Sequence, residues 1–227
     1  MSDPTTSGAA SAIRGVRWGA VARHADVRGS FRELWRAGWF TGPARIAAGG
    51  IPAGGIPAGG IGESARIGAP LGAAGAAPVA PEPRFAQANL STSAPGVLRG
   101  LHLHRRQLDY WVVADGRAWV ALVDARPLLD GSGDRPIVET RELAADATVT
   151  IPAGVAHGFL ALEQLSLVYL VTAEYDATDE LGFAWDDPLA AIRWPDVPGQ
   201  ANGRPILSGR DLSNPSLLAL VERIRSE

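Results

Sequence analysis

Short runs rich in Val, Trp and Tyr, separated by turn residues, restrict the fold of this chain more than any other feature. The clearest runs are YWVVADGRAWVALVDAR (110 to 126), ATVTIPAG (147 to 154) and LSLVYLVTAEY (165 to 175). Runs of this length and composition, punctuated by Asp-Gly and Pro-x-Gly, are typical of an antiparallel β sandwich or barrel. Asp115-Gly116 lies between two such runs and predicts a hairpin. We therefore expect an all-β barrel.

Helical periodicity is convincing only near the C-terminus. The segment NPSLLALVERI (214 to 224) has helical spacing of its apolar residues, with Asn214 as the expected N-cap and Pro215 in the first turn. We predict one short C-terminal helix that accompanies the barrel.

Composition divides the chain into one domain with an insertion. Residues 42–83 are nearly all Gly, Ala, Pro and Ile and include the tandem GGIPAGGIPAGGI, which offers few large side chains for a packed core. We expect a flexible surface insertion there. Residues 1–41 would then supply N-terminal strands, and residues 84–227 the barrel and C-terminal helix of the same domain.

Charge and composition exclude several classes of partner. A net charge of -3, from 21 basic and 24 acidic residues, gives no signature of nucleic-acid binding. The N-terminus is small and polar, and no run approaches the roughly 18 apolar residues of a membrane span. The chain has no cysteine, which excludes disulfides and thiolate metal sites and fits a reducing compartment. We expect a cytoplasmic protein without membrane or nucleic-acid partners.

Three of the four histidines lie in two short segments, VLRGLHLHRR (97 to 106) and IPAGVAHGFL (151 to 160). His102 and His104 are two residues apart, so on a strand both side chains face the same side. Together with Asp109 they resemble the first cupin motif, with Asp in place of Glu, and residues 152–157 resemble the second. The resemblance implies a cupin-type double-stranded β-helix, a jelly-roll barrel whose inward residues line a ligand cavity.

A closer resemblance covers nearly all of the chain outside the insertion. Seven segments follow one another as they do in the dTDP-4-dehydrorhamnose 3,5-epimerase family: ADVRGSFRELW (25 to 35), FAQANLSTSAPGVLRGLH (85 to 102), IPAGVAHGF (151 to 159), VYLVTAEY (168 to 175), LGFAWDDP (181 to 188), IRWP (192 to 195) and ILSGRD (206 to 211). This resemblance implies an isomerase of deoxysugar (rhamnose-like) biosynthesis, which epimerises a dTDP-4-keto-6-deoxyhexose at C3, C5 or both. It implies no metal or redox cofactor. It also implies a homodimer, in which an N-terminal strand crosses to complete the partner's nucleotide site.

The resemblance assigns a role to each matching residue. His102 matches the base that removes the acidic proton beside the C4 ketone, Asp211 the carboxylate that pairs with this base, and Tyr169 the acid that protonates the opposite face. His157, Glu180 and Arg210 match substrate contacts, and Tyr175 falls where an aromatic ring stacks on thymine. The matches to the nucleotide-diphosphate and base contacts are Arg28, Glu33, Gln87, Asn89 and Arg99.

Elementary chemistry supports these roles. A carbon acid beside a ketone needs a base whose pKa lies near the working pH, and imidazole has such a pKa. A carboxylate on the far ring nitrogen fixes the tautomer and stabilises the imidazolium. Arginines suit a diphosphate because the guanidinium fork binds oxygens in pairs.

Asp109 departs from the family pattern. The family has a lysine at this position, whose ammonium stabilises the enolate oxygen, and the loop before it is shorter here. Two unit charges about 4 Å apart at an effective dielectric near 20 interact by about 4 kcal/mol, so an ionised Asp109 facing the enolate would oppose catalysis. Another group must supply the positive charge.

Several interpretations are open at this point. Arg105 or Arg106 could reach in from the shortened loop and leave an ordinary epimerase, the account we favour on sequence alone. Alternatively, a divalent ion could supply the charge as a Lewis acid or support oxygen chemistry. The HLHRR stretch also resembles the paired-histidine motif of dTDP-sugar 3,4-ketoisomerases, and a barrel without the lysine could be a non-catalytic sugar-nucleotide-binding accessory protein. The ligands of the metal alternative would be His102, His104, Asp109 and His157.

Overall fold

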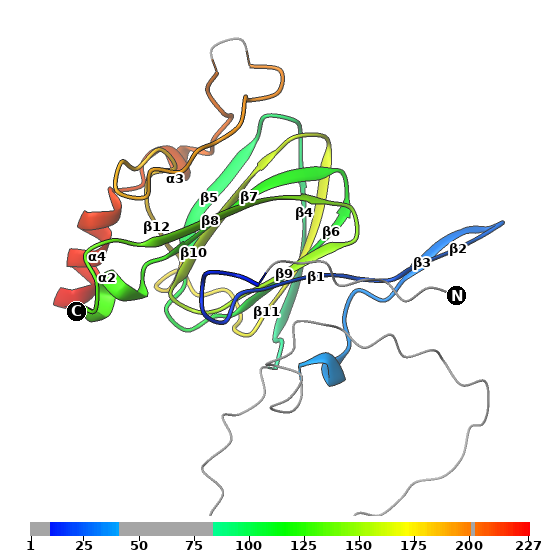
Figure 1. Ribbon diagram of the computed structural model, residues 1–227, viewed down its shortest axis with the longest axis horizontal. Helices are drawn as coiled ribbons and strands as arrows, with labels where there is room; N and C mark the ends of the chain where they lie inside the picture. The colour runs from blue at the N-terminus through cyan, green and yellow to red at the C-terminus, as the bar shows by residue number, and fades with distance from the viewer. Residues whose placement is uncertain (1–9, 41–83, 201–202) are drawn as a thin grey trace, which may run out of the picture.

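Two five-stranded antiparallel sheets face each other in the computed structural model, which describes residues 10–40, 84–200 and 203–227 (Figure 1). The first sheet has the order β1-β9-β6-β11-β4, and the second has the order β12-β5-β10-β7-β8. The strands of the first sheet are β1 (Arg17–Ala20), β4 (Gln87–Ser93), β6 (Asp109–Asp115), β9 (Ala147–Ile151) and β11 (Leu165–Val171). Those of the second are β5 (Leu98–Leu103), β7 (Arg117–Asp124), β8 (Ile137–Ala144), β10 (Val155–Ala161) and β12 (Leu181–Gly182). The predicted all-β jelly roll is confirmed.

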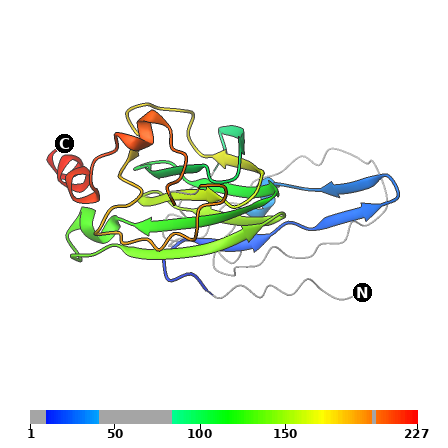
Figure 2. The same cartoon turned by 90° about the horizontal axis from the view of Figure 1, so that it is seen from above.

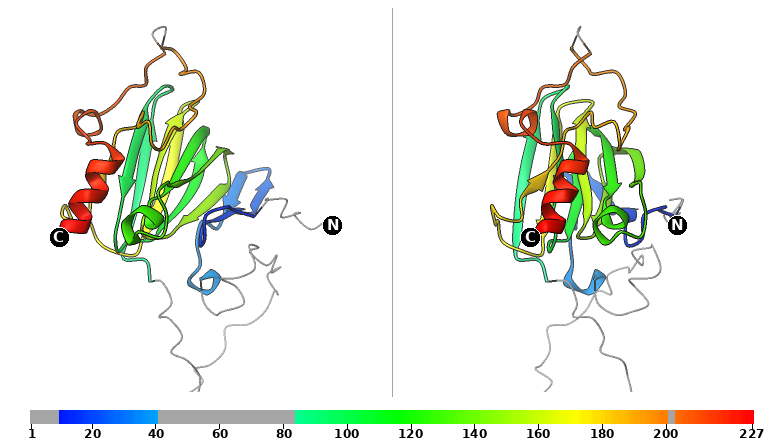
Figure 3. Two further views of the ribbon diagram at one scale, coloured as in Figure 1. Left: turned by 60° about the vertical axis from the view of Figure 1, so that its left-hand side comes forward. Right: turned by 90° about the vertical axis from the view of Figure 1, so that its left-hand side faces the viewer.

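Helices are short and lie outside the barrel. They are η1 (Ala37–Trp39), α2 (Arg126–Asp130), α3 (Gly209–Leu212) and α4 (Leu217–Ser226). Figure 3 shows α4 standing beside the second sheet, close to α2. The predicted C-terminal helix is therefore present.

The second sheet is buried on both faces. Along β7, Val120 and Leu122 pack between the two sheets, whereas Ala121 and Val123 belong to the cluster that contains Leu217 of α4. The strand period of two sends alternate residues to opposite faces, so both faces need apolar residues. This explains the nearly continuous apolar run of residues 118–123.

The turn at Gly116 does not form the expected hairpin. β6 pairs with β9 and β11 in the first sheet, whereas β7 pairs with β8 and β10 in the second. The chain therefore passes from one sheet to the other at this turn. Gly116 has a φ of +82°, and a Cβ there would lie 2.1 Å from the carbonyl oxygen of Gln164, so the passage requires glycine.

The cap of the C-terminal helix also differs from the prediction. Ser216, rather than Asn214, is the N-cap, and its side chain accepts a hydrogen bond from the backbone N–H of Ala219. Pro215 precedes the helix, and its carbonyl accepts from the N–H of Ala184. Leu217 is thus the first helical residue, and its side chain is fully buried.

The N-terminal strands divide between the barrel and an extension. β1 pairs with β9 at the edge of the first sheet. β2 (Arg23–Asp26) and β3 (Gly29–Arg32) form a hairpin that projects away from the barrel (Figure 2). The predicted insertion at 42–83 lies outside the described residues, and the division into 1–41, 42–83 and 84–227 stays a prediction. No helix in the described ranges has the length and apolar character needed to cross a membrane.

Candidate active site

A cavity of about 350 Å³ lies between the two sheets. This volume is within the range of small-molecule sites. Nine of the predicted site residues line it, and strands of both sheets contribute to them. These nine are Gln87, Asn89, Arg99, His102, His157, Tyr169, Tyr175, Glu180 and Arg210.

His102 and Asp211 form the pair that the sequence predicted. His102 lies on β5, and its Nε2 is 2.9 Å from Oδ1 of Asp211 on α3. Ser208, the N-cap of α3, donates from Oγ to the other carboxylate oxygen at 2.9 Å. Burial raises the pKa of Asp211, but the hydrogen bonds from His102 and Ser208 outweigh burial and lower the net pKa. Asp211 is thus ionised at neutral pH and holds the histidine by Nε2, which leaves Nδ1 for proton transfer.

Tyr169 reaches the cavity from the opposite sheet. It lies on β11, where it pairs with Asn89 of β4 and Trp111 of β6. Its half-burial raises the pKa of the phenol, and the charges of Asp109 and Glu180 add to this effect. The hydroxyl therefore keeps its proton at neutral pH and can act as an acid.

Two arginines bring positive charge to the cavity. Arg99 donates from Nε to Ser93 Oγ at 3.0 Å and from Nη2 to the Thr92 carbonyl at 3.2 Å. Arg210 donates to Glu180 Oε1 at 2.8 Å, and Oε1 is also 3.8 Å from His102 Nδ1. The cavity lining thus contains two arginines, and Arg210 is paired with a carboxylate.

Two predicted nucleotide contacts lie away from the cavity. Arg28 is at the tip of the β2–β3 hairpin, 86% exposed, and pairs with Asp26. Glu33 follows the hairpin and accepts from Arg36. Neither residue is among those that line the cavity within one chain.

Asp109 lies buried inside the cavity. Gln107 Nε2 donates to its Oδ1 at 2.8 Å, and Trp111 Nε1 donates to its Oδ2 at 3.1 Å. His157 Nε2 is 3.6 Å from the same Oδ2. Sequence reasoning missed both partners. The spacing of two residues places Trp111 on the same face of β6 as Asp109, whereas Gln107 lies in the loop before the strand.

The structure contradicts the account in which Arg105 or Arg106 supplies the missing positive charge. Arg105 binds Asp179 and Glu227, and Arg106 binds Asp176. Neither arginine lines the cavity. The carboxylates that hold both guanidinium groups do not line the cavity either.

A jelly roll that places a histidine–carboxylate pair and a protonated tyrosine in one cavity is a cupin barrel equipped for proton transfer. Comparisons with known proteins are consistent with this class. The sequence model of the dTDP-4-dehydrorhamnose 3,5-epimerase family matches residues 74–219, and the chain belongs to this family. Named members of the family are epimerases, enzymes of the isomerase class.

Individual relatives agree with the family match. The chain is 39% identical to the dTDP-4-dehydrorhamnose 3,5-epimerase of Mycobacterium tuberculosis over 137 residues, 57% of this chain and 64% of that protein. The sequence match therefore spans less than two thirds of the relative's length.

Solved structures match over more of the chain. The RmlC epimerase of M. tuberculosis superposes with a TM-score of 0.67 and 26% identity, and the alignment covers 96% of each chain. ChmJ, a 3'-monoepimerase from Streptomyces bikiniensis solved in complex with dTDP-quinovose, superposes with a TM-score of 0.66 and 27% identity over 94% of this chain and 89% of ChmJ.

Proposed function

We propose that this protein epimerises a dTDP-4-keto-6-deoxyhexose at C3, C5 or both, in deoxysugar biosynthesis. In this reaction His102 removes the proton beside the C4 ketone and Tyr169 supplies a proton to the opposite face. The observation that carries the proposal is the position of the two side chains, which enter one cavity from facing sheets. A sugar ring between the sheets would have the base on one side and the acid on the other.

The protonation states suit this sequence of events. Asp211 occupies Nε2 of His102, so Nδ1 would accept the substrate proton and the carboxylate would stabilise the resulting imidazolium. Tyr169 keeps its proton until the enolate needs it, because burial raises the pKa of the phenol. Epimerisation results when the proton is removed from one face and returned to the other.

Further lining residues suit a nucleotide. Arg99 is fixed by Ser93 and Thr92 and can bind diphosphate oxygens. Gln87 accepts a hydrogen bond from the backbone N–H of Tyr175, which orients that segment. The Tyr175 ring is largely exposed and would stack on thymine.

A hydrogen-exchange experiment tests the activity. Full-length protein is incubated with dTDP-4-keto-6-deoxyglucose in deuterated water, and NMR follows the C3 and C5 hydrogens. We expect deuterium at one or both carbons and its loss in His102→Ala, with dTDP binding retained. Exchange at C3 alone identifies a monoepimerase. A 3-keto product would identify ketoisomerisation instead, and nucleotide binding without any turnover would identify an accessory protein.

We further propose a homodimer in which the β2–β3 hairpin of each chain completes the partner's nucleotide site. The exposed position of Arg28, distant from the cavity lining of its own chain, supports this arrangement. Light scattering should give twice the mass of one chain, and Arg28→Ala should weaken dTDP binding. A monomeric mass would contradict the proposal. We propose a cytoplasmic location as well, which cell fractionation tests.

A further inference from the structure

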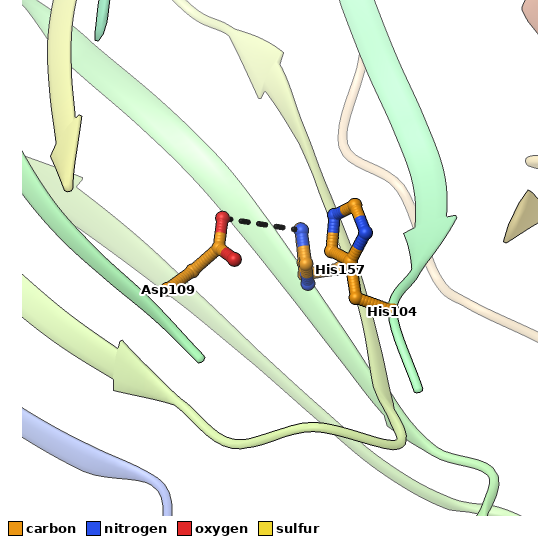
Figure 4. Close-up of side chains that lie close together, drawn as sticks. All are labelled: His104, Asp109 and His157. Atoms are coloured by element: carbon orange, nitrogen blue, oxygen red, sulfur yellow. Dashed lines mark ion pairs between the residues drawn. The ribbon is translucent and has the colours of Figure 1, made fainter. Parts of the chain in front are cut away.

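Three buried side chains with metal-ligating atoms meet in the cavity. They are His104 directly after β5, Asp109 at the start of β6 and His157 on β10, and their candidate ligand atoms lie within 4.8 Å of one another. Figure 4 shows the two imidazole rings side by side and the carboxylate turned toward them. The ring centroids are 5.4 Å apart. The cluster combines residues from both sheets.

Backbone carbonyls fix the tautomer of each histidine. His157 Nδ1 is 3.1 Å from the Val155 carbonyl oxygen, and His104 Nδ1 is 3.0 Å from the carbonyl oxygen of Asp179. A carbonyl only accepts hydrogen bonds, so each Nδ1 must carry a hydrogen. In a neutral ring, Nε2 then carries a lone pair. Metal-binding histidines have this arrangement, in which the other ring nitrogen donates to a carbonyl or carboxylate.

Asp109 is held as a third donor of electron pairs. Gln107 and Trp111 each donate a hydrogen bond to it, which fixes the orientation of the carboxylate. Its Oδ2 is 3.6 Å from His157 Nε2, and a lone pair facing a carboxylate at that distance repels it. A cation bound by both groups would remove this repulsion.

We propose that His104 Nε2, His157 Nε2 and the Asp109 carboxylate bind one divalent transition-metal ion. Metal–ligand bonds of roughly 2.0–2.2 Å would require side-chain rotations that bring these atoms closer together. Two imidazoles and one carboxylate are a ligand set for such ions and leave coordination positions open. His102 is left out of the set, because the ligand atoms that lie close together belong to His104, Asp109 and His157, whereas Nε2 of His102 pairs with Asp211.

The ion would also supply the positive charge that the cavity chemistry needs. Asp109, His102 and Tyr169 line the same cavity, so an open coordination position can face the C4 ketone oxygen and stabilise the enolate as a Lewis acid. This second part rests on the proposed epimerase function, whereas metal binding does not.

Calorimetry on the full-length protein tests metal binding. Chelator-treated and dialysed protein is titrated with Zn²⁺ and, separately, with Mn²⁺, and Co²⁺ binding is followed by visible absorption. We expect one ion per chain. Asp109→Asn and His104→Gln should each weaken binding about 100-fold or more, while His24→Ala, at an exposed histidine on the hairpin, should bind as the unmodified protein does.

Two outcomes would overturn the site. One is the absence of binding, and the other is unchanged affinity in both ligand variants. Circular dichroism and dTDP binding establish that each variant is folded, so that a lost site is distinguished from a lost fold.

Deuterium exchange with and without metal separates the two parts of the proposal. Exchange that disappears with chelator and returns with metal supports the Lewis-acid role. Exchange that is equally fast without metal overturns that role and leaves the binding site. Stoichiometric metal binding with no exchange in either form refutes the epimerase function instead.

Discussion

At the residue scale, the cavity contains two histidine–aspartate contacts with opposite properties. His102 Nε2 and Asp211 Oδ1 are 2.9 Å apart, and the other carboxylate oxygen accepts from Ser208, so this contact holds the imidazole by one ring nitrogen. His157 and Asp109 are 3.6 Å apart, and the proton of His157 lies on the far ring nitrogen. The first contact suits a general base, whereas the second suits the proposed metal ion.

The Asp211 carboxylate should be needed for catalysis rather than for binding. Asp211→Asn keeps the size of the side chain but removes the charge that stabilises the imidazolium. We expect the rate of C3/C5 exchange to fall about 100-fold or more, with dTDP affinity unchanged. Ser208→Ala is the matched control, since it removes the second hydrogen bond and leaves the His102 contact, and should cost less. Equal exchange rates in Asp211→Asn and the unmodified protein would refute the role.

Burial of His157 should make the metal-free protein less stable in acid. Burial lowers the pKa of His157 to about 4, and the charge of Asp109 only partly opposes this. An unfolded histidine titrates near 6.5, so between these values the unfolded state binds the additional proton. This contribution to stability is fully present above about pH 6.5 and is lost as the pH falls toward 4, by about 2 kcal/mol between pH 7.5 and 5.

Urea unfolding in the presence of chelator measures this effect. The free energy of unfolding is compared at pH 7.5 and 5 for the unmodified protein and His157→Gln. The variant should show the smaller loss, because carboxylates elsewhere contribute equally to both proteins. The same loss in both would show that His157 is not the titrating group.

At the element scale, the positions of strands were more predictable than which strands pair with one another. The short runs rich in Val, Trp and Tyr placed β6, β7, β9 and β11 correctly, because such residues suit the pleated, buried surface of a sheet. The hairpin at Gly116 was wrong, because an Asp-Gly turn specifies that the chain reverses but not whether the next strand joins the same sheet. The helix cap was wrong by two residues, because Asn214 and Ser216 are both good caps and burial of Leu217 selects between them.

The site residues, like the strands, were predicted in part. Histidine spacing and family resemblance brought nine residues into one cavity, but the sequence could not show the direction of Arg105 and Arg106, since loop carboxylates such as Asp179 and Asp176 determine it. In the sequence, the predicted epimerase residues and the predicted metal ligands also shared His102 and His157. The structure separates the proposed base from the proposed metal cluster, because His102 pairs with Asp211 while His104, Asp109 and His157 lie together.

The turn at residue 116, where the chain passes from the first sheet to the second, should require glycine. Gly116→Ala combines a positive φ with a Cβ 2.1 Å from the Gln164 carbonyl oxygen, and backbone cannot yield as a flexible side chain does. We expect a loss of about 3 kcal/mol or more in the free energy of unfolding, measured with urea. Gly199→Ala is the control, because Gly199 has a φ of +72° but no atom within 4 Å of the added Cβ. Strain alone should cost about 1–2 kcal/mol there, so equal losses would show that the clash contributes nothing.

At the scale of the whole molecule, the site depends on two sheets held at a fixed separation. Val120, Leu122 and Phe159 of the second sheet pack against Trp111 and Leu167 of the first. The same strands present polar side chains to the cavity where this packing ends. Apolar packing between the sheets thus sets the width of the cavity.

Ligand binding should therefore stabilise the whole barrel through residues that connect its sheets. Arg99 extends from β5 to Ser93 and Thr92 of β4, and so joins the second sheet to the first beside the cavity. A ligand that binds only the folded state at about 100 times its Kd adds about 2.7 kcal/mol to the free energy of unfolding. We expect dTDP to raise the unfolding temperature accordingly.

Arg99→Lys tests whether the guanidinium carries this stabilisation. Lysine keeps the charge but loses the paired donors, so at the same dTDP concentration the thermal shift should fall well below that of the unmodified protein. His102→Ala is the matched control, because it removes the proposed base from the same strand and should keep most of the shift. A full shift in Arg99→Lys would place the diphosphate elsewhere, and loss of the shift in His102→Ala alone would mean that dTDP binds through the sugar end of the cavity.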